Sequence, residues 1–412
     1  GRSTVTEALC TLRGVAEGHF SDYHRLFSRA PWSLWTLGRI LAAQALALLP
    51  ESEPVVVVMD DTTAQHKGRK VYGKGCHHDA VRSAHAKLVH VWGHKWVVLA
   101  VSVRFSFASR PWALPVLVAL YRPRELNEAE SRRHKTPADL ARGLMAVLTR
   151  WFPARCFIFL GDGGYASHNL ARAAARHKRM HLVSRLHPEA NLYAPPPERR
   201  NPKGGRPRLK GKKLPSPREV VKKARLRTAT VAWYGGGTRS VGLVSGTGHW
   251  YKAGQGLVPI RWVYVKDKTG THRDEWFYTT DVAMAPERIV SLYTERWSLE
   301  VTFQETKGRL GLETTRQWKA ASVLRTAPLL LGLYSVVALL YARLHRDAPE
   351  RTSPRQESWY AKGESTFADA LEAVRRELWA ESVFTTAGFH RGFQNLQTDL
   401  KETLLEQLSR AA

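Results

Sequence analysis

Apolar and amphipathic stretches alternate along the first half of the chain. Runs rich in β-branched and aromatic residues, as in strands of a buried sheet, lie at 55–59, 96–107, 114–121, 156–160 and 180–186. Residues 137–151 and 167–177 suit helices, and Thr136 and Pro137 suit the N-cap and first turn of the first one. The order strand, strand, strand, helix, strand, helix, strand predicts a mixed α/β sheet with flanking helices.

The composition changes after residue 189, where prolines and glycines interrupt a basic run. Its cations are Arg199, Arg200, Lys203, Arg206, Arg208, Lys210, Lys212 and Lys213. Strand-like segments follow at 228–234, 240–245 and 260–266. We therefore predict a β-rich insertion over 190–275 with a flexible basic arm. Phosphate binding is favoured over a plain solvated loop, because almost no acids separate these cations.

Helical patterns occupy both ends of the chain. Leu34, Leu37, Leu41 and Leu48 recur at helical spacing, so residues 1–52 are predicted to form a helical region that binds DNA or serves only for packing. A helix follows from Pro286, and the apolar run 327–342 is shorter than a membrane span of about 20 residues, which favours a core helix. Residues 346–412 are predicted to be a helical tail and a candidate dimer surface. The sheet domain then comprises 53–189 and 276–345.

The net charge of the 412-residue chain is +27, which implies a polyanionic partner. Nucleic acid is the first candidate, and an anionic membrane surface is the second. The three cysteines are far apart and odd in number, so they indicate no disulfide framework and fit a reducing cytosol. Cys76 precedes two histidines, but no second Cys/His cluster stands at zinc-site spacing.

Two acidic segments follow predicted strands. Asp60 and Asp61 come after the strand 55–59, and Asp162 comes after the strand 156–160. Carboxylates at the carboxyl ends of strands lie where open α/β sheets place their chemistry, although Asp is also common in turns and at helix N-caps. Together they predict a paired site in which carboxylate oxygens hold Mg²⁺.

The predicted helix from Pro286 carries a third carboxylate in a patterned setting. Tyr293, Arg296, Glu300 and Lys307 fall on one face about 60° wide if each residue turns the helix by 100°. An apolar stripe beside this face would pack against the sheet. Arg296 and Glu300 also have the spacing of an ordinary helical ion pair, but that pairing does not explain the tyrosine, the lysine or the shared face.

Tyr-x2-Arg-x3-Glu-x6-Lys is the signature of a large group of DDE transposases from bacterial insertion sequences, and this chain matches it at Tyr293, Arg296, Glu300 and Lys307. The segments DDTT at 60–63 and GDGGYA at 161–166 resemble the first and second Asp motifs of these transposases. The resemblance covers roughly residues 55–310. It implies an RNase H-like fold that a β-rich insertion interrupts between the second Asp and the Glu.

The resemblance makes Asp162 and Glu300 metal-binding catalytic carboxylates. The first Asp stays open between Asp60 and Asp61, because each begins an Asp-x-Thr pattern and side chains alternate faces along a strand; Asp60 is slightly preferred. By the same resemblance, Arg296 and Lys307 contact phosphates, Tyr293 positions the strand end, and Trp276 resembles the aromatic residue that receives a flipped base. A tryptophan packed in a strand is the plain alternative for Trp276.

The implied activity is cleavage at transposon ends and transfer of the freed 3′-hydroxyl into target DNA, with two Mg²⁺ ions for which Mn²⁺ can substitute. We expect double-stranded DNA as partner, a homodimer on DNA, no membrane, no small-molecule substrate and a place in the bacterial cytoplasm at the nucleoid. Two rivals remain: a catalytically silent DNA-binding protein, such as a domesticated transposase, and a structure-specific nuclease without strand transfer. Intact carboxylates beside phosphates argue against the silent protein.

Overall fold

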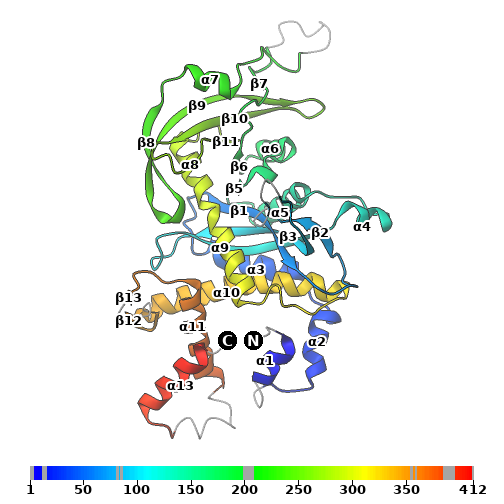
Figure 1. The fold of residues 1–412 in the computed structure, drawn as a ribbon, viewed down its shortest axis with the longest axis vertical. Helices are drawn as coiled ribbons and strands as arrows, with labels where there is room; N and C mark the ends of the chain where they lie inside the picture. The colour runs from blue at the N-terminus through cyan, green and yellow to red at the C-terminus, as the bar shows by residue number, and fades with distance from the viewer. Residues whose placement is uncertain are drawn as a thin grey trace.

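A computed structural model describes residues 4–11, 16–79, 83, 87–197, 208–352, 356–357, 360–383 and 395–410. One twisted sheet runs through most of the molecule, with helices on both of its faces and a cluster of helices from both chain ends at one end (Figure 1). The prediction of a mixed α/β sheet with flanking helices and helical terminal regions is confirmed.

Five of the six strands in the first half of the sheet lie at the predicted apolar runs, and the sixth, Gly75–His78, was not predicted. The six strands are β1 (Val55–Gln65), β2 (Gly75–His78), β3 (His90–Val103), β4 (Trp112–Tyr121), β5 (Phe157–Gly161) and β6 (Met180–Arg185). β3 is antiparallel to β1, β2 and β4, whereas β5 lies parallel to both β1 and β6. This strand arrangement fits the RNase H-like core expected from the sequence. β1 does not end at Met59 as predicted, because its polar segment 60–65 stays paired with β3 up to Gln65 opposite Gly93.

The β-rich region extends this same sheet. β11 (Glu275–Thr279) pairs with β6, and beyond it lie β10 (Gly256–Asp267), β9 (Thr238–Lys252), β8 (Arg227–Ala232) and β7 (Leu192–Tyr193). α7 (Pro217–Lys223) lies between β7 and β8 along the chain. The predicted boundaries at 189–190 and 275–276 therefore separate strands that are hydrogen-bonded in one sheet, and the division into domains stays a prediction.

Helices cover the two faces of the sheet with separate hydrophobic cores. One face packs against α3 (Leu34–Leu46), α5 (Pro137–Trp151) and α6 (His168–Ala175), and the other against α8 (Pro286–Glu295) and α9 (Trp297–Arg309). Thr136 is the N-cap of α5, as predicted, and it also forms a capping box with Asp139. The remaining α-helices among the described residues are α1 (Val5–Thr11), α2 (Phe20–Ser28), α4 (Arg124–Ala129), α10 (Ala320–Asp347), α11 (Phe367–Leu378) and α13 (Thr398–Arg410).

α10 is long and apolar enough to cross a membrane, and it is the one such helix among the described residues. It packs along β4, α3 and α11 and contributes side chains to both hydrophobic cores. Ser335 Oγ donates to Pro115 O at 2.8 Å, and Tyr341 Oη donates to Thr352 O at 2.6 Å. These contacts are those of the core helix that the sequence favours.

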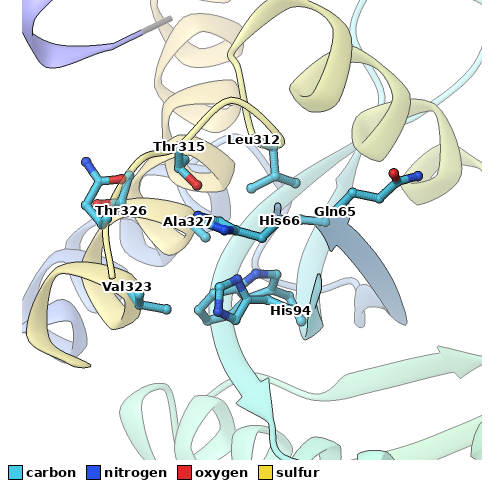
Figure 2. Close-up of a pocket in the computed structure, with 11 residues that line it drawn as sticks. Gln65, His66, His94, Leu312, Thr315, Val323, Thr326 and Ala327 are labelled. Carbon is cyan, nitrogen blue, oxygen red and sulfur yellow. The ribbon is translucent and has the colours of Figure 1, made fainter. Parts of the chain in front are cut away.

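The connection between α9 and α10 folds back over the end of β1. Figure 2 shows Leu312 and Thr315 from this connection facing His66 and His94, with Val323 of α10 beside them. The backbone N–H of Tyr72 donates to Trp318 O at 3.0 Å. The segment after β1 and the segment after α9 are therefore joined, although about 250 residues separate them in the sequence.

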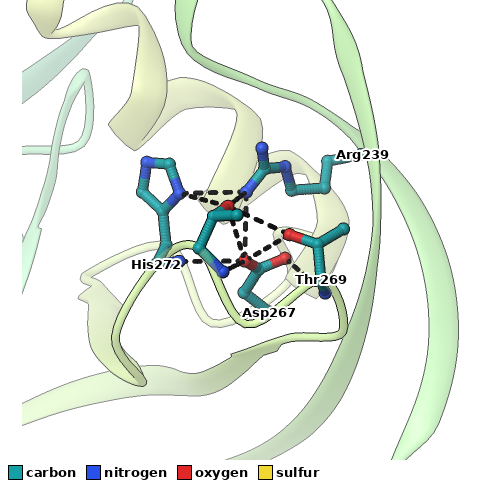
Figure 3. Close-up of polar contacts among 5 residues, drawn as sticks. Arg239, Asp267, Thr269 and His272 are labelled. Atoms are coloured by element: carbon teal, nitrogen blue, oxygen red, sulfur yellow. Dashed lines mark hydrogen bonds and ion pairs between the residues drawn. The ribbon is translucent and has the colours of Figure 1, made fainter.

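The turn between β10 and β11 is organised by one buried carboxylate. Asp267 accepts hydrogen bonds from the amides of Thr269, Thr271 and His272, from the hydroxyls of Thr269 and Thr271, and from Arg239 (Figure 3). Although burial opposes ionisation, these donors and the Arg239 charge hold the pKa of Asp267 well below its usual value. Asp267 therefore ties the turn to the end of β10 and to Arg239 of β9.

Candidate functional site

Asp60 and Asp162 lie side by side on neighbouring parallel strands. Met59 of β1 is in register with Gly161 of β5, so the next residue of each strand is an aspartate. Asp162 Oδ1 accepts the amide of Gly164 at 2.8 Å, and Ser184 Oγ donates to Asp162 O at 2.8 Å. The first and second Asp motifs of the sequence therefore meet at one position in the sheet.

The turn after β5 requires glycine before the aspartate. A Cβ on Gly161 would lie 2.6 Å from Tyr165 Cβ and 3.1 Å from Met59 Cε, closer than side-chain packing allows. The absent side chain lets the short helical turn Gly163–Tyr165 fold back under β1 and bury the Tyr165 ring. The segment GDGGY thus sets where Asp162 stands relative to Asp60.

Arg296 joins the third carboxylate to the first. Its Nη1 lies 2.7 Å from Asp60 Oδ2, and its Nη2 lies 2.8 Å from Glu300 Oε1. The side chains of Arg296 and Asp60 are nearly buried, whereas that of Glu300 is 44% exposed. Asp60, Arg296 and Glu300, which are all predicted site residues, are therefore joined by two consecutive ion pairs.

The charges of this cluster are strongly coupled. Burial raises the pKa of Asp60 to about 7, with Asp162 and Asp61 adding to the rise and Arg296 opposing it. Burial also disfavours the charge on Arg296, yet Asp60, Tyr293, Glu300 and Asp162 raise its pKa above the usual value. The site thus holds more negative charge than one guanidinium neutralises, which is the environment that binds a cation.

Asp61 points to the opposite face of the sheet. Its Oδ2 lies 3.2 Å from Lys95 Nζ, and its Oδ1 accepts the Tyr165 hydroxyl at 3.1 Å. Strand alternation places Asp60 and Asp61 on different faces, and α9, which carries Glu300, covers the face of Asp60. Of the two aspartates that the sequence left open, the structure therefore groups Asp60 with Asp162 and Glu300.

Tyr293 sits beneath the cluster and does not reach solvent. Its ring stacks on Phe277 with the centroids 4.0 Å apart, and its buried hydroxyl has no hydrogen-bond partner among the described residues. The guanidinium groups of Arg185 and Arg296 each lie 5.7 Å from the ring centroid. The Tyr293 ring therefore packs against two arginine side chains. A direct contact of Tyr293 with the end of a DNA strand stays a prediction.

Arg185 and Glu275 belong to this neighbourhood and were missed in the sequence. Arg185 ends β6, the strand next to β5, and forms an ion pair with Glu275 of β11. A Cβ on Gly163, the residue after Asp162, would lie 3.7 Å from Arg185 Cδ. The sequence signal for Arg185 was its position at the end of a strand adjacent to the second Asp motif. Its partner Glu275 lies 90 residues away, so the ion pair has no local sequence pattern.

The signature segment forms two helices instead of the continuous helix predicted from Pro286. α8 ends and α9 begins at Arg296, whose backbone N–H bonds to Tyr293 O, three residues back, at 3.2 Å. This tighter turn breaks the uniform 100° rotation on which the shared face was based. Tyr293, Arg296 and Glu300 stay connected, whereas Lys307 pairs with Glu313 at 3.7 Å beyond the cluster.

Trp276 faces away from the carboxylates. Its ring centroid lies 4.6 Å from that of Tyr264 and 6.3 Å from that of Trp262, on the sheet face that α3, α5 and α6 cover. Asp60 and Glu300 lie on the other face. The arrangement is that of the packed aromatic residue named as the plain alternative, and base stacking on Trp276 stays a prediction.

The basic arm is described only from residue 208 onward, so Arg206 and the cations before it lie outside the described residues. Arg208, Lys212 and Lys213 are exposed. Lys210 instead lies between two aromatic rings, with its Nζ 4.4 Å from the Tyr193 centroid and 4.2 Å from the Tyr251 centroid. Lys210 therefore anchors the arm to β7 and β9, and its cationic group is already engaged.

The donor set suits a divalent cation, but the side chains are not assembled around one position. Carboxylate oxygens are what Mg²⁺ prefers, and Asp60, Asp162 and Glu300 supply them. Within the described ranges, no three His, Cys, Asp or Glu side chains are grouped closely enough to hold a metal ion. Glu300 is turned toward Arg296, so an ion held by all three carboxylates requires Arg296 to release Glu300.

Comparisons with known proteins identify the family to which the chain belongs. The family described as DDE superfamily endonuclease matches residues 1–240, which is more than half of the chain. Among solved structures, the fold is similar to that of the piggyBac transposase in a synaptic complex with hairpin DNA, with a TM-score of 0.40 and 14% identity over 87% of this chain. The chain spans 57% of the length of that transposase. A comparison with curated protein sequences found no match.

Proposed function

Because the chain belongs to the DDE superfamily endonucleases, we propose that it is a DNA transposase that cleaves the ends of a transposon and joins the freed 3′-hydroxyl to target DNA. One observation carries this proposal: Arg296 links Asp60 to Glu300 beside Asp162, so the residues of all three acidic motifs lie at one end of the sheet. Nucleases of this superfamily generally use divalent metal ions.

We propose that Asp60, Asp162 and Glu300 hold two Mg²⁺ ions, or Mn²⁺, which activate the attacking water or 3′-hydroxyl and stabilise the leaving oxygen. The protein's own groups orient the DNA. Once Arg296 leaves both Asp60 and Glu300, its two terminal nitrogens can bind two phosphate oxygens as they now bind two carboxylates. Tyr293 keeps Arg185 beside Arg296, which places a second cation next to the scissile phosphate.

DNA binding also draws on charge outside the cluster. The net charge of +27 favours phosphate binding along a long stretch of duplex, and Arg208, Lys212 and Lys213 are exposed at the base of the basic arm. The proposal includes a homodimer on DNA, because the two transposon ends have to be held together before transfer. α11 and α13 are our candidate dimer surface, and the bacterial cytoplasm at the nucleoid is the expected location.

The test is a cleavage assay on DNA that carries the ends of the element encoding this chain, with Mg²⁺ and then with EDTA. Glu300→Gln removes the exposed carboxylate of the cluster, and Glu305→Gln is its matched control, because Glu305 lies on the same helix and pairs with Arg309. We expect Mg²⁺-dependent cuts by the wild type and the control, no cuts by Glu300→Gln, and DNA binding by Glu300→Gln at least as tight as that of the other two proteins, because the substitution frees Arg296.

Other outcomes identify the rival functions. Salt-sensitive binding without any cut by the wild type indicates the catalytically silent DNA-binding protein. Cuts without joining to a target duplex indicate the structure-specific nuclease. Normal cleavage by Glu300→Gln refutes the assignment of the site itself.

A further inference from the structure

Two cationic loops lie next to each other at one end of the proposed active site. The loop 66–74 follows β1 and carries Lys67, Arg69, Lys70 and Lys74. The loop 313–319 follows α9 and carries Arg316 and Lys319. Glu313, the first residue of the second loop, is the single acidic residue in the two loop sequences. Apart from Lys74, which is half-buried, these cations are exposed to solvent.

The loops are fixed to each other and to the core. Tyr72 N–H donates to Trp318 O at 3.0 Å, and Lys74 Nζ donates to Gly68 O within the first loop. Burial and the charges of Lys74 and Arg316 lower the pKa of His66, so cations of both loops converge on one side chain. Beneath them, His66 and His94 pack against the start of α10 (Figure 2). The cations therefore lie on loops that are hydrogen-bonded to each other and packed against α10.

Exposed tryptophans accompany these cations. Trp318 in the second loop and Trp92 at the start of β3 are each 60% exposed. Lys319 Nζ lies 5.3 Å from the Trp318 ring centroid, and Lys74 Nζ lies 5.5 Å from that of Trp92. A large aromatic ring left in water among cations serves as a stacking surface for a base whose phosphates the cations bind.

The loops begin where the signature elements end. Glu313 pairs with Lys307 at 3.7 Å and accepts the backbone N–H of Gln65 at 3.2 Å. Gln65 lies five residues beyond Asp60 along β1, a distance of about 17 Å. At the 3.4 Å per nucleotide of a duplex strand, DNA that runs from Asp60 past Lys307 reaches the loops after about five nucleotides, and after fewer if the strand is more extended.

We propose that the loops 66–74 and 313–319, with Trp92, form a stacking platform that holds single-stranded DNA beside the catalytic site. The cations bind its phosphates, and Trp318 stacks on an unpaired base. Single-stranded DNA is the favoured occupant because paired bases in a duplex do not offer a face to Trp318. Contact of this platform with the strand being cleaved rests on the proposed function, whereas its affinity for single strands does not.

The test measures binding of a fluorescent oligothymidylate of about 20 nucleotides and of a mixed-sequence duplex of the same length, by anisotropy in EDTA. Trp318→Ala should weaken single-strand binding by roughly 5- to 150-fold and leave duplex binding nearly unchanged. Trp318→Phe should restore most of the loss, because it keeps an aromatic face. Thermal melts of both variants check that the fold is intact.

The cations are tested by the salt dependence of binding. Replacing Lys67, Arg69 and Lys70 with Ala should lower the slope of log affinity against log salt by about 2 for the single strand. A matched control replaces the exposed Arg150, Arg176 and Lys178 with Ala. These residues lie at or after the ends of α5 and α6, ahead of the starts of β5 and β6, so they are at the opposite end of the parallel strands. The control should keep the wild-type slope.

Several results would overturn the platform: no single-strand binding by the wild type, full affinity in Trp318→Ala, or an equal loss of slope in the control. Equal weakening of single-strand and duplex binding by Trp318→Ala would also overturn it and would point to a duplex contact. Failure of the proposed function is seen separately, as DNA that the wild type binds but does not cut in Mg²⁺.

Discussion

Substituting the two adjacent aspartates one at a time separates the two faces of β1. Asp60→Asn removes a carboxylate that lies beside Asp162 and Arg296, whereas Asp61→Asn removes one that lies against Lys95 and Tyr165. We expect Asp60→Asn to abolish Mg²⁺-dependent cleavage and Asp61→Asn to retain it within about tenfold, because asparagine keeps the oxygen that accepts the Tyr165 hydroxyl.

The two substitutions should also change stability in opposite directions. The pKa of Asp60 is raised to about 7 in the folded protein, so the contribution of this group to stability is greatest below its unfolded pKa and is lost as the pH rises through 7. By pH 8, a rise of about three pKa units means that ionised Asp60 lowers the free energy of unfolding by at most about 4 kcal/mol. Asp60→Asn should therefore unfold no earlier than the wild type at pH 8 without metal.

Asp61→Asn should instead be mildly destabilising. Its ion pair with Lys95 is about one-quarter exposed on each side, so solvent screening limits the loss to about 1 kcal/mol. Urea unfolding at pH 8 in EDTA, followed by circular dichroism, gives the midpoints of both variants and the wild type. Cleavage by Asp60→Asn with loss of cleavage in Asp61→Asn would show that this reading of the two faces is wrong. An earlier midpoint for Asp60→Asn would refute the electrostatic argument.

Three further substitutions test separate parts of the molecule. Asp267→Asn should lower the free energy of unfolding at pH 7 by roughly 2–4 kcal/mol, because several donors of the turn lose a buried charged acceptor. Because the pKa of Asp267 is lowered by folding, the wild type should begin to lose this advantage as the pH falls below about 4, and urea midpoints should approach each other progressively at lower pH. Trp276→Ala should destabilise by about 3–5 kcal/mol, and an unchanged midpoint would contradict its packed role. Glu313→Gln should tighten duplex binding by roughly two- to fivefold at low salt by releasing Lys307, and weaker binding in an anisotropy titration would contradict that direction.

The sequence predicted most elements of the sheet, because local patterns specify them. Val55–Met59 and the run before Gly161 are continuously apolar, and both form strands of the buried core. The polar residues Asp60–Gln65 do not have a strand pattern, yet they remain in β1 through pairing with β3. Whether such a segment forms a strand depends on pairing with a neighbouring strand, and the periodicity of the segment does not reveal that neighbour.

The site was predictable as a set of motifs, but its geometry was not. The acidic motifs and Arg296 were found from spacing, whereas the choice between Asp60 and Asp61 depended on which face α9 covers. The break at Arg296 and the contact of Arg185 with Glu275 arise from packing between distant segments. Trp276 shows the same limit, since an aromatic residue in a strand looks alike whether it packs or binds.

The link that Arg296 makes between Asp60 and Glu300 has a consequence for when the protein can act. An internal guanidinium already offsets part of the negative charge of Asp60 and Glu300. A divalent cation then competes with Arg296 for the carboxylates. Its apparent affinity is the intrinsic affinity multiplied by the fraction of molecules in which Arg296 has released them. DNA phosphates that draw Arg296 away would raise that fraction, so substrate and metal would favour each other's binding and the resting protein would stay silent.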